Sequence, residues 1–196
     1  MAGRPTSDWL PRVLFESFLI VISILVALAL DEWRETREDD DTVRQALLNF
    51  HSEISQNKSR IEDDAQFNHG LLNVLQRRSR EVDVDSVEEF VNMVESYTPA
   101  VLQSTAWETA LATGSLAKMD YNLVSALSLT YSLQGRYQAA TRMGMDDLMS
   151  PQNLTPNQMN LAVFNSVRYL GDTTGMEAEL VAVYNEASAV IRSALD

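Results

Sequence analysis

The sequence predicts an all-α protein in which a single N-terminal transmembrane helix continues into a long stalk helix, followed by an antiparallel helical bundle. Four observations support this prediction. Residues 13–30 form an apolar run with a single charge, and no proline interrupts the chain from Asp31 to about Arg80. Glycine is scarce, with seven in 196 residues, and alternating apolar and polar strand patterns are absent. Scarce glycine and proline favour long helices over turn-rich sheets.

The composition limits the possible functions. The length suits one domain with an attached segment, and the net charge is −13. Nucleic acid is bound by clustered Lys and Arg, so a chain this acidic is not expected to bind it. The chain contains no cysteine, which excludes a disulfide framework, a thiolate nucleophile and the common structural zinc sites. We expect no cofactor.

The run VLFESFLIVISILVALAL, residues 13–30, is long enough to cross a bilayer. As a helix it would extend roughly 27 Å, close to the thickness of a hydrocarbon core. Trp9 and Trp33 flank the run, which would place one ring near each headgroup layer. The alternative is a cleaved signal peptide, since Ala27-Leu28-Ala29 has the small-x-small form of a cleavage site. The length of the run and the helical periodicity beyond it favour a retained anchor.

Three residues of the anchor have side chains suited to contacts. Glu16 is the only ionisable residue of the run, and Arg12 lies four residues before it. We interpret Glu16 as a residue of the membrane interface that pairs with Arg12, rather than as a proton carrier. Ser23 and Ala27 form a small-xxx-small pair that could seat another helix. The anchor is therefore expected to be a contact surface as well as a tether.

The stalk carries a heptad pattern of apolar residues. Its members follow a 4-3-4-7 spacing in which Asn57 occupies the missing position, and they are Val43, Leu47, Phe50, Ile54 and Ile61. Such a seam needs a partner. The sequence leaves three partners open: a second copy in a coiled coil, the C-terminal helices folding back, or a different subunit.

The remaining chain reads as helices with clear end signals. Ser86 to Glu89 and Thr105 to Glu108 each form a capping box, and Gly114 is suited to close the short helix after the second box. Asp120 is expected to cap a helix that reaches about residue 149. A further helix is predicted from Thr155-Pro156 to Gly171, and a last one from about residue 174 to 195.

The sequence offers little support for catalysis. His51 and His69 are 18 residues apart and lie in no metal-binding motif, and the acidic clusters 39–41 and 62–64 lack the glycine of a calcium loop. No nucleophile elbow, Walker A loop or dinucleotide-binding turn occurs. Trp107 and Glu108 could line a pocket, although a core tryptophan beside a capping glutamate is the favoured explanation.

The anchor carries a specific pattern, E-x4-V-I-x-I-L-x-A-L-x4-W-x-E-x-R, from Glu16 to Arg37. It resembles the anchor of a family of uncharacterised bacterial single-pass inner-membrane proteins, a domain of unknown function. A second stretch, Ala106-Trp107-Glu108 followed by Gly114 and Leu116, is similar to another element of that family. The resemblance covers about residues 13–135. It implies architecture and location in the bacterial envelope, and it carries over no catalytic residues.

Together these features predict a short tail at 1–12, a transmembrane helix at 13–30, a long acidic stalk helix at 31–82 and a helical bundle domain at 83–196 that packs on the stalk. We expect the N-terminus to be cytoplasmic and the C-terminal domain periplasmic, although basic residues flank both ends of the span.

The sequence favours a non-catalytic, membrane-anchored interaction protein whose partners are the lipid bilayer and membrane proteins, either other subunits or its own copies. An accessory or stabilising subunit of a larger inner-membrane complex, respiratory or photosynthetic, fits this description. The alternatives are a periplasmic small-ligand sensor or binding module and, third, a membrane-anchored enzyme.

Overall fold

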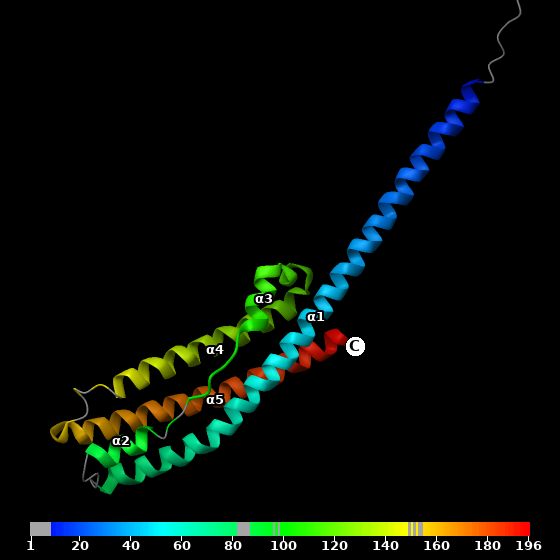
Figure 1. The fold of residues 1–196 in the computed structure, drawn as a ribbon. Coiled ribbons are helices and arrows are strands. Elements are labelled where there is room, and N and C mark those ends of the chain that lie inside the picture. The colour runs from blue at the N-terminus through cyan, green and yellow to red at the C-terminus, as the bar shows by residue number, and fades with distance from the viewer. Residues whose placement is uncertain are drawn as a thin grey trace, which may run out of the picture. The chain divides into compact units, whose positions relative to one another are not determined.

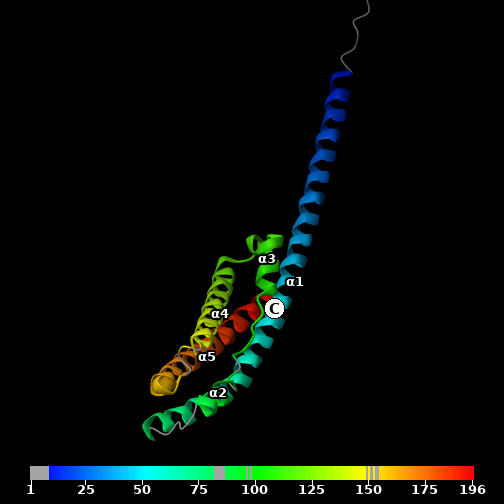
Figure 2. The same ribbon diagram turned by 60° about the vertical axis from the view of Figure 1, so that its left-hand side comes forward.

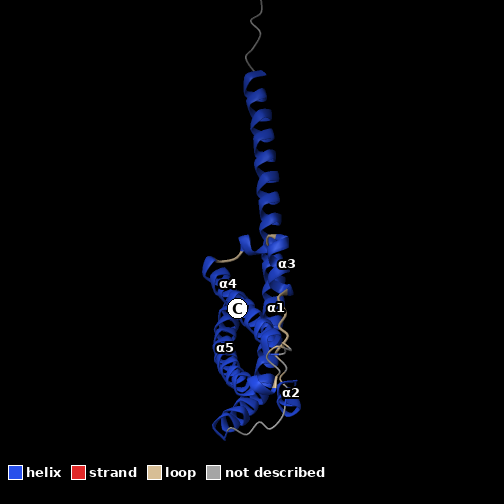
Figure 3. Ribbon diagram, turned by 90° about the vertical axis from the view of Figure 1, so that its left-hand side faces the viewer, coloured by secondary structure: helices blue, strands red, loops and turns tan. Residues whose placement is uncertain are grey.

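The protein is all-helical in the computed structural model, which describes residues 9–81, 87–95, 97, 99–148, 150, 152 and 155–196. Among these residues there is no β-strand (Figure 3). Two 3-10 turns, η1 (Ser115–Lys118) and η2 (Pro156–Gln158), precede helices α4 and α5. The α-helices are α1 (Trp9–Glu81), α2 (Val87–Glu95), α3 (Thr105–Thr113), α4 (Tyr121–Leu148) and α5 (Met159–Leu195).

Helix α1 is 73 residues long and contains both the apolar run and the predicted stalk. Its continuity confirms that one helix extends from before the apolar run to about residue 80. The chain separates into an N-terminal unit, residues 1–44, and a C-terminal unit, residues 45–196. This division falls inside α1, so residues 45–81 belong to the same compact unit as the helices that follow them.

In the C-terminal unit, α4 and α5 lie side by side and run in opposite directions (Figures 1 and 2). The part of α1 that belongs to this unit also lies beside α5, and an Asn68–Glu177 hydrogen bond joins the two helices. Arg78 and Glu89 form an ion pair between α1 and α2. These contacts bring α1, α4 and α5 around a shared interior.

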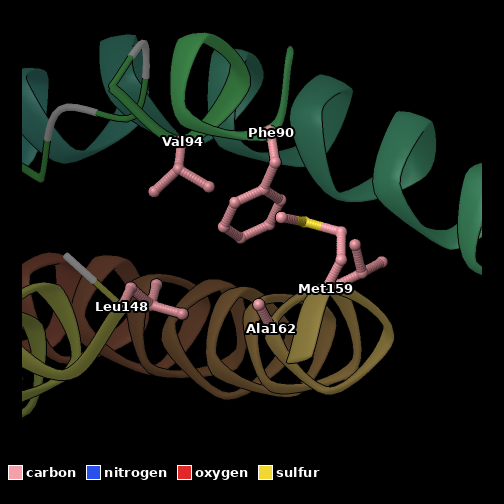
Figure 4. Packing of buried hydrophobic residues seen from close by; sticks show 6 residues of the cluster. Phe90, Val94, Leu148, Met159 and Ala162 are labelled. Carbon is pink, nitrogen blue, oxygen red and sulfur yellow. The ribbon is translucent and has the colours of Figure 1, made fainter. Parts of the chain in front are cut away.

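An apolar cluster closes the interior where α2 meets α4 and α5 (Figure 4). The ring of Phe90 and the thioether of Met159 point toward each other, and Val94 and Leu148 lie beside them. Phe90 is fully buried, and the cluster is completed by Ala162 and Val163. Burial of one such side chain contributes roughly 1.5–3 kcal/mol. Helix α2 has only nine residues, too few to be stable alone, and this cluster is one of the contacts that hold it in place.

Two predicted helix ends are confirmed. Gly114 adopts the left-handed conformation, with φ of 71°, and its N–H donates to the carbonyl oxygen of Leu111. Asp120 Oδ1 accepts a hydrogen bond of 2.8 Å from the N–H of Asn122, as expected of an N-cap residue. Helix α4 then ends at Leu148, close to its predicted end.

The predicted break at Gly171 is wrong, because α5 continues through Gly171 to Leu195. A buried stripe on either side of the glycine explains the difference: Leu170, Thr174 and Glu177 keep one face of the helix against its neighbours. A glycine inside a helix costs only about 1 kcal/mol, which this burial exceeds.

The Thr105–Glu108 capping box is also wrong. The N-cap of α3 is Ser104, and Glu108 accepts a hydrogen bond of 2.7 Å from the Ser104 hydroxyl rather than bonding to Thr105. The other predicted capping box includes Ser86, which lies outside the described residues.

Candidate functional site

The anchor residues named from the sequence belong to the N-terminal unit. Glu16 lies 3.5 Å from Arg12 in an exposed ion pair. The Ser23 hydroxyl donates to the carbonyl oxygen of Leu19, within the same helix, so it is already satisfied. Ala27 is exposed on this helix. The side chain of Trp9 lies outside the described residues, although its backbone is helical.

Trp33 carries the clearest interaction of this unit. The guanidinium carbon of Arg37 lies 4.2 Å from the centre of the Trp33 ring. A cation over an indole face gains roughly 0.5–1 kcal/mol at an exposed site. The arrangement presents an aromatic body and a charged group at the end of the apolar run.

The heptad seam of the stalk is buried by the chain's own helices. Leu47 is 2% exposed, and Phe50, Ile54 and Ile61 are fully buried. Val43 lies in the N-terminal unit and is half-buried. The ring of Phe50 contacts Trp107 and Tyr131 at centroid distances of 6.5 and 5.9 Å. Of the three partners left open by the sequence, the structure shows the folded-back C-terminal helices at this seam.

The buried face of α1 also carries polar side chains, and Glu53 is the first of them. One carboxylate oxygen accepts a hydrogen bond of 2.7 Å from the Tyr131 hydroxyl of α4, and the other accepts one of 2.9 Å from the N–H of Ala106 in the first turn of α3. A carboxylate at a helix N-terminus is favoured by the unsatisfied N–H groups and the helix dipole. The Glu53 side chain therefore caps the N-terminus of α3, which the Ser104 side chain does not, and it connects α1 to α3 and α4.

Asn57 occupies the gap in the seam and is fully buried. Its amide nitrogen donates to the carbonyl oxygen of Gln103 at 2.7 Å and to Gln134 at 3.1 Å, and its oxygen accepts from the N–H of Gln103 at 2.9 Å. The Tyr184 hydroxyl donates to the same Gln134 oxygen at 2.8 Å. This group fixes the segment before α3 against α1, α4 and α5.

A third polar group joins α1 to α5. Asn68 is fully buried and Glu177 is 1% exposed. The amide nitrogen of Asn68 and the hydroxyl of Tyr137 both donate to Oε1 of Glu177, at 2.8 and 3.2 Å. Burial raises the pKa of the Glu177 carboxyl. Burial also raises the pKa of Tyr137, so its hydroxyl stays protonated and can donate.

The predicted pocket residues lie together at a surface depression. Trp107 stacks on Tyr131, with ring centroids 5.4 Å apart and planes inclined by 23°. Trp107, Glu108 and Tyr131 border a cavity of about 330 Å³, together with Gly135 and polar residues of α4 that include Ser128. Trp107 is half-buried and Glu108 exposed. Trp107 thus packs against the core residues Phe50 and Tyr131 and also lines the cavity.

Four interior polar residues are not predicted by the sequence patterns: Glu53, Asn68, Gln134 and Glu177. A signal existed in the heptad register: continued beyond Ile61, the seam passes through position 68 before the buried Leu71 and Leu75. Glu53 lies beside the seam position Ile54, and nothing in the spacing distinguishes it from a solvated glutamate.

No group of three or more His, Asp or Glu side chains is placed to hold a metal ion in the part of the chain that the structure describes. Comparison with known protein families, with curated proteins and with solved structures finds no match to this chain. The geometry of its own residues is therefore the basis for any functional proposal.

Proposed function

We propose that this chain is a non-catalytic, membrane-anchored helical interaction protein in which residues 13–30 span a bilayer. The observation that carries the proposal is the exposure of this run. Its large apolar side chains are between 40% exposed, at Ile22, and 64% exposed, at Leu14. One helix of the described chain is long and apolar enough to cross a membrane, and none of the residues in its most apolar 18-residue segment is buried by the rest of the chain. Exposed apolar surface of this extent requires lipid or protein around it.

The residues at either end of the run suit a headgroup layer. The Arg12–Glu16 pair lies at the start of the run, and Trp33 with Arg37 follows its end. Aromatic rings and long basic side chains favour this zone because each has an apolar body and a polar end. We retain the expected orientation, with the N-terminus in the cytoplasm of a bacterial cell and the C-terminal unit in the periplasm.

For the C-terminal unit we propose an antiparallel helical bundle whose interior serves packing and register rather than chemistry. Phe50, Ile54 and Ile61 fill the seam, and the polar residues Glu53 and Asn57 are hydrogen-bonded to the chain itself. The seam therefore gives no support to an external partner. The anchor does, because its apolar faces are the exposed ones.

The partner is proposed to be one or more integral proteins of a larger inner-membrane assembly, with the Ser23 and Ala27 side of the anchor facing them. Small side chains let two helices approach closely in lipid, where dispersion contacts replace the hydrophobic effect. Respiratory and photosynthetic complexes remain the candidates that the sequence suggested.

The test is purification of the tagged full-length chain from its native membranes in mild detergent, followed by mass spectrometry of the proteins that accompany it. We expect defined membrane proteins to co-purify. The variant Ser23→Phe with Ala27→Phe should lose them, whereas Leu25→Phe, which enlarges a side chain on the opposite face, should retain them. A chain that migrates as a lone monomer and retains nothing would end the proposal.

A second candidate function, binding of a small ligand in a sensor or binding module, is favoured by one observation. Trp107 and Glu108 border a cavity of about 330 Å³, near the lower end of the range of roughly 300–1,000 Å³ typical of ligand pockets. The test is a thermal-shift screen with a metabolite library. Gly135→Leu should abolish any stabilisation, because Gly135 borders the cavity and a Cβ there meets nothing within 4 Å. Stabilisation that survives this variant would assign the ligand elsewhere.

A further inference from the structure

Asn68 and Glu177 form a buried contact between α1 and α5 in which two of the polar atoms have no hydrogen-bond partner. Asn68 is 0% and Glu177 1% exposed. The amide nitrogen of Asn68 donates to Oε1 of Glu177 at 2.8 Å, and the Tyr137 hydroxyl donates to the same oxygen at 3.2 Å. Both available donors thus go to a single carboxyl oxygen.

The remaining oxygen of each group has no partner. Oε2 of Glu177 and Oδ1 of Asn68 are buried and accept no hydrogen bond. If Glu177 were ionised, both atoms could only accept, and each would incur the cost of a buried polar atom without a hydrogen bond. A single proton on Oε2 would remove both deficits if that hydroxyl donated to Asn68 Oδ1, the other buried oxygen without a donor.

We propose that Glu177 is held as a neutral carboxylic acid whose Oε2–H donates to Asn68 Oδ1, and that this acid–amide pair is a proton-dependent latch between α1 and α5. A carboxylic acid and a primary amide are complementary: each offers one donor and one acceptor, so two hydrogen bonds form between the two groups.

The groups that face Glu177 agree with this assignment. Burial is the largest effect on the Glu177 carboxyl and raises its pKa, and the Asp64 carboxylate of α1 acts in the same direction. The hydrogen bonds from Asn68 and Tyr137 and the charge of His69, also on α1, oppose the rise without cancelling it. Tyr97, in the segment after α2, and Tyr169, on α5, also interact with Glu177, and burial raises the pKa of both hydroxyls, which keeps them neutral.

The sign of the pH dependence follows from the raised pKa. The stabilising contribution of a neutral Glu177 is fully present below the unfolded-state pKa, near 4.5, and is lost as the pH rises through the higher folded-state value. Ionisation would bring a charge into the interior and leave Asn68 Oδ1 unpaired. The contact between α1 and α5 therefore weakens as the pH rises.

The test compares the full-length protein in detergent with Glu177→Gln, whose amide mimics the protonated acid and cannot ionise. We expect the two unfolding midpoints to coincide near pH 4.5. At pH 8 the variant should unfold at least about 7 °C higher, because a carboxyl that is still protonated at pH 7 costs the wild type about 1.4 kcal/mol for each pH unit above 4.5, and roughly 1 kcal/mol shifts the midpoint of a chain of this size by about 2–4 °C. Infrared difference spectra at pH 7 should show the carbonyl band of a protonated carboxyl in the wild type and not in the variant.

Glu53→Gln is the matched control. Glu53 is also buried, but both its oxygens accept from donors, Tyr131 and Ala106, so an amide there would set one donor against another. It should unfold at a lower temperature than the wild type at every pH. The proposal is overturned if Glu177→Gln unfolds below the wild type at pH 8, or if the protonated-carboxyl band is absent at pH 7. Either result would indicate an ionised Glu177 paired with a buried water or cation instead.

Discussion

The ring of Tyr169 on α5 lies directly against Gly144 on α4. A Cβ built at Gly144 would come within 2.0 Å of Cε2 of Tyr169 and 2.3 Å of Cδ2. The Tyr169 hydroxyl donates to the carbonyl oxygen of Thr141 at 3.0 Å, which holds the ring in this position. The absence of a side chain at Gly144 therefore sets how closely α4 and α5 approach.

Gly144→Ala should destabilise the protein. Alanine gains up to about 1 kcal/mol of helix propensity over glycine. The Tyr169 ring cannot easily move away, because a hydrogen bond restrains it. We therefore expect the clash to outweigh this gain and to leave a net loss of about 1–3 kcal/mol. Thermal unfolding of the full-length chain followed by circular dichroism measures the difference.

Gly135→Ala is the control for this prediction, since it lies in the same helix and a Cβ there meets nothing within 4 Å. It should stabilise the protein by about 0.5–1 kcal/mol. If both variants stabilise equally, Tyr169 does not limit the approach of the two helices.

Asn57→Leu completes the apolar heptad of α1, so the sequence pattern alone favours a gain in stability. We expect a loss. The N–H of Gln103 would lose its acceptor, and Gln134 would lose a donor inside the core. The Gln103 N–H is then left without an acceptor, which costs about 1–3 kcal/mol, whereas the Gln134 oxygen still accepts from the Tyr184 hydroxyl. Asn49→Leu, on an exposed part of the same helix, should change stability by less than about 0.5 kcal/mol in the same unfolding experiment. Equal stability of the wild type and Asn57→Leu would show that the Asn57 hydrogen bonds are dispensable.

Tyr131→Phe should lower the free energy of unfolding by about 1.5–3 kcal/mol, the usual worth of a hydrogen bond to a charged group. The change removes the hydroxyl that donates to Glu53 at 2.7 Å while keeping the ring that stacks on Trp107. Chemical denaturation measures it. Tyr121→Phe, at a residue 82% exposed, is the control and should have no effect. An unchanged free energy of unfolding in Tyr131→Phe would mean that the hydrogen bond from the N–H of Ala106 is sufficient to stabilise the buried Glu53 side chain.

The orientation of the anchor can be determined by single-cysteine labelling, because the chain contains no cysteine of its own. We expect Ser193→Cys, at an exposed position near the end of α5, to react with a membrane-impermeant maleimide in intact cells with a permeabilised outer membrane. Ser7→Cys should react only after the inner membrane is disrupted. The opposite labelling pattern would place the C-terminal unit in the cytoplasm.

The sequence alone determined the helical class and most helix ends. These features depend on local physics: the apolar run of α1, the left-handed glycine at Gly114 and the cap at Asp120 each act within a few residues of the chain. Local patterns also gave the seam positions, since a heptad repeat places Phe50, Ile54 and Ile61 on one face whatever they contact.

Only the tertiary structure decided what fills that face and which polar residues are interior. Gly171 lies within α5 because the neighbouring helices bury Leu170 and Glu177 on either side of it, and no local signal carries that information. Tyr131, which donates to Glu53, and Glu177, which accepts from Asn68, lie 78 and 109 residues away from these partners along the chain. A carboxylate on a helix surface has the same sequence signature whether it faces water or a buried tyrosine, so burial and its consequences for charge appear only once the helices are packed.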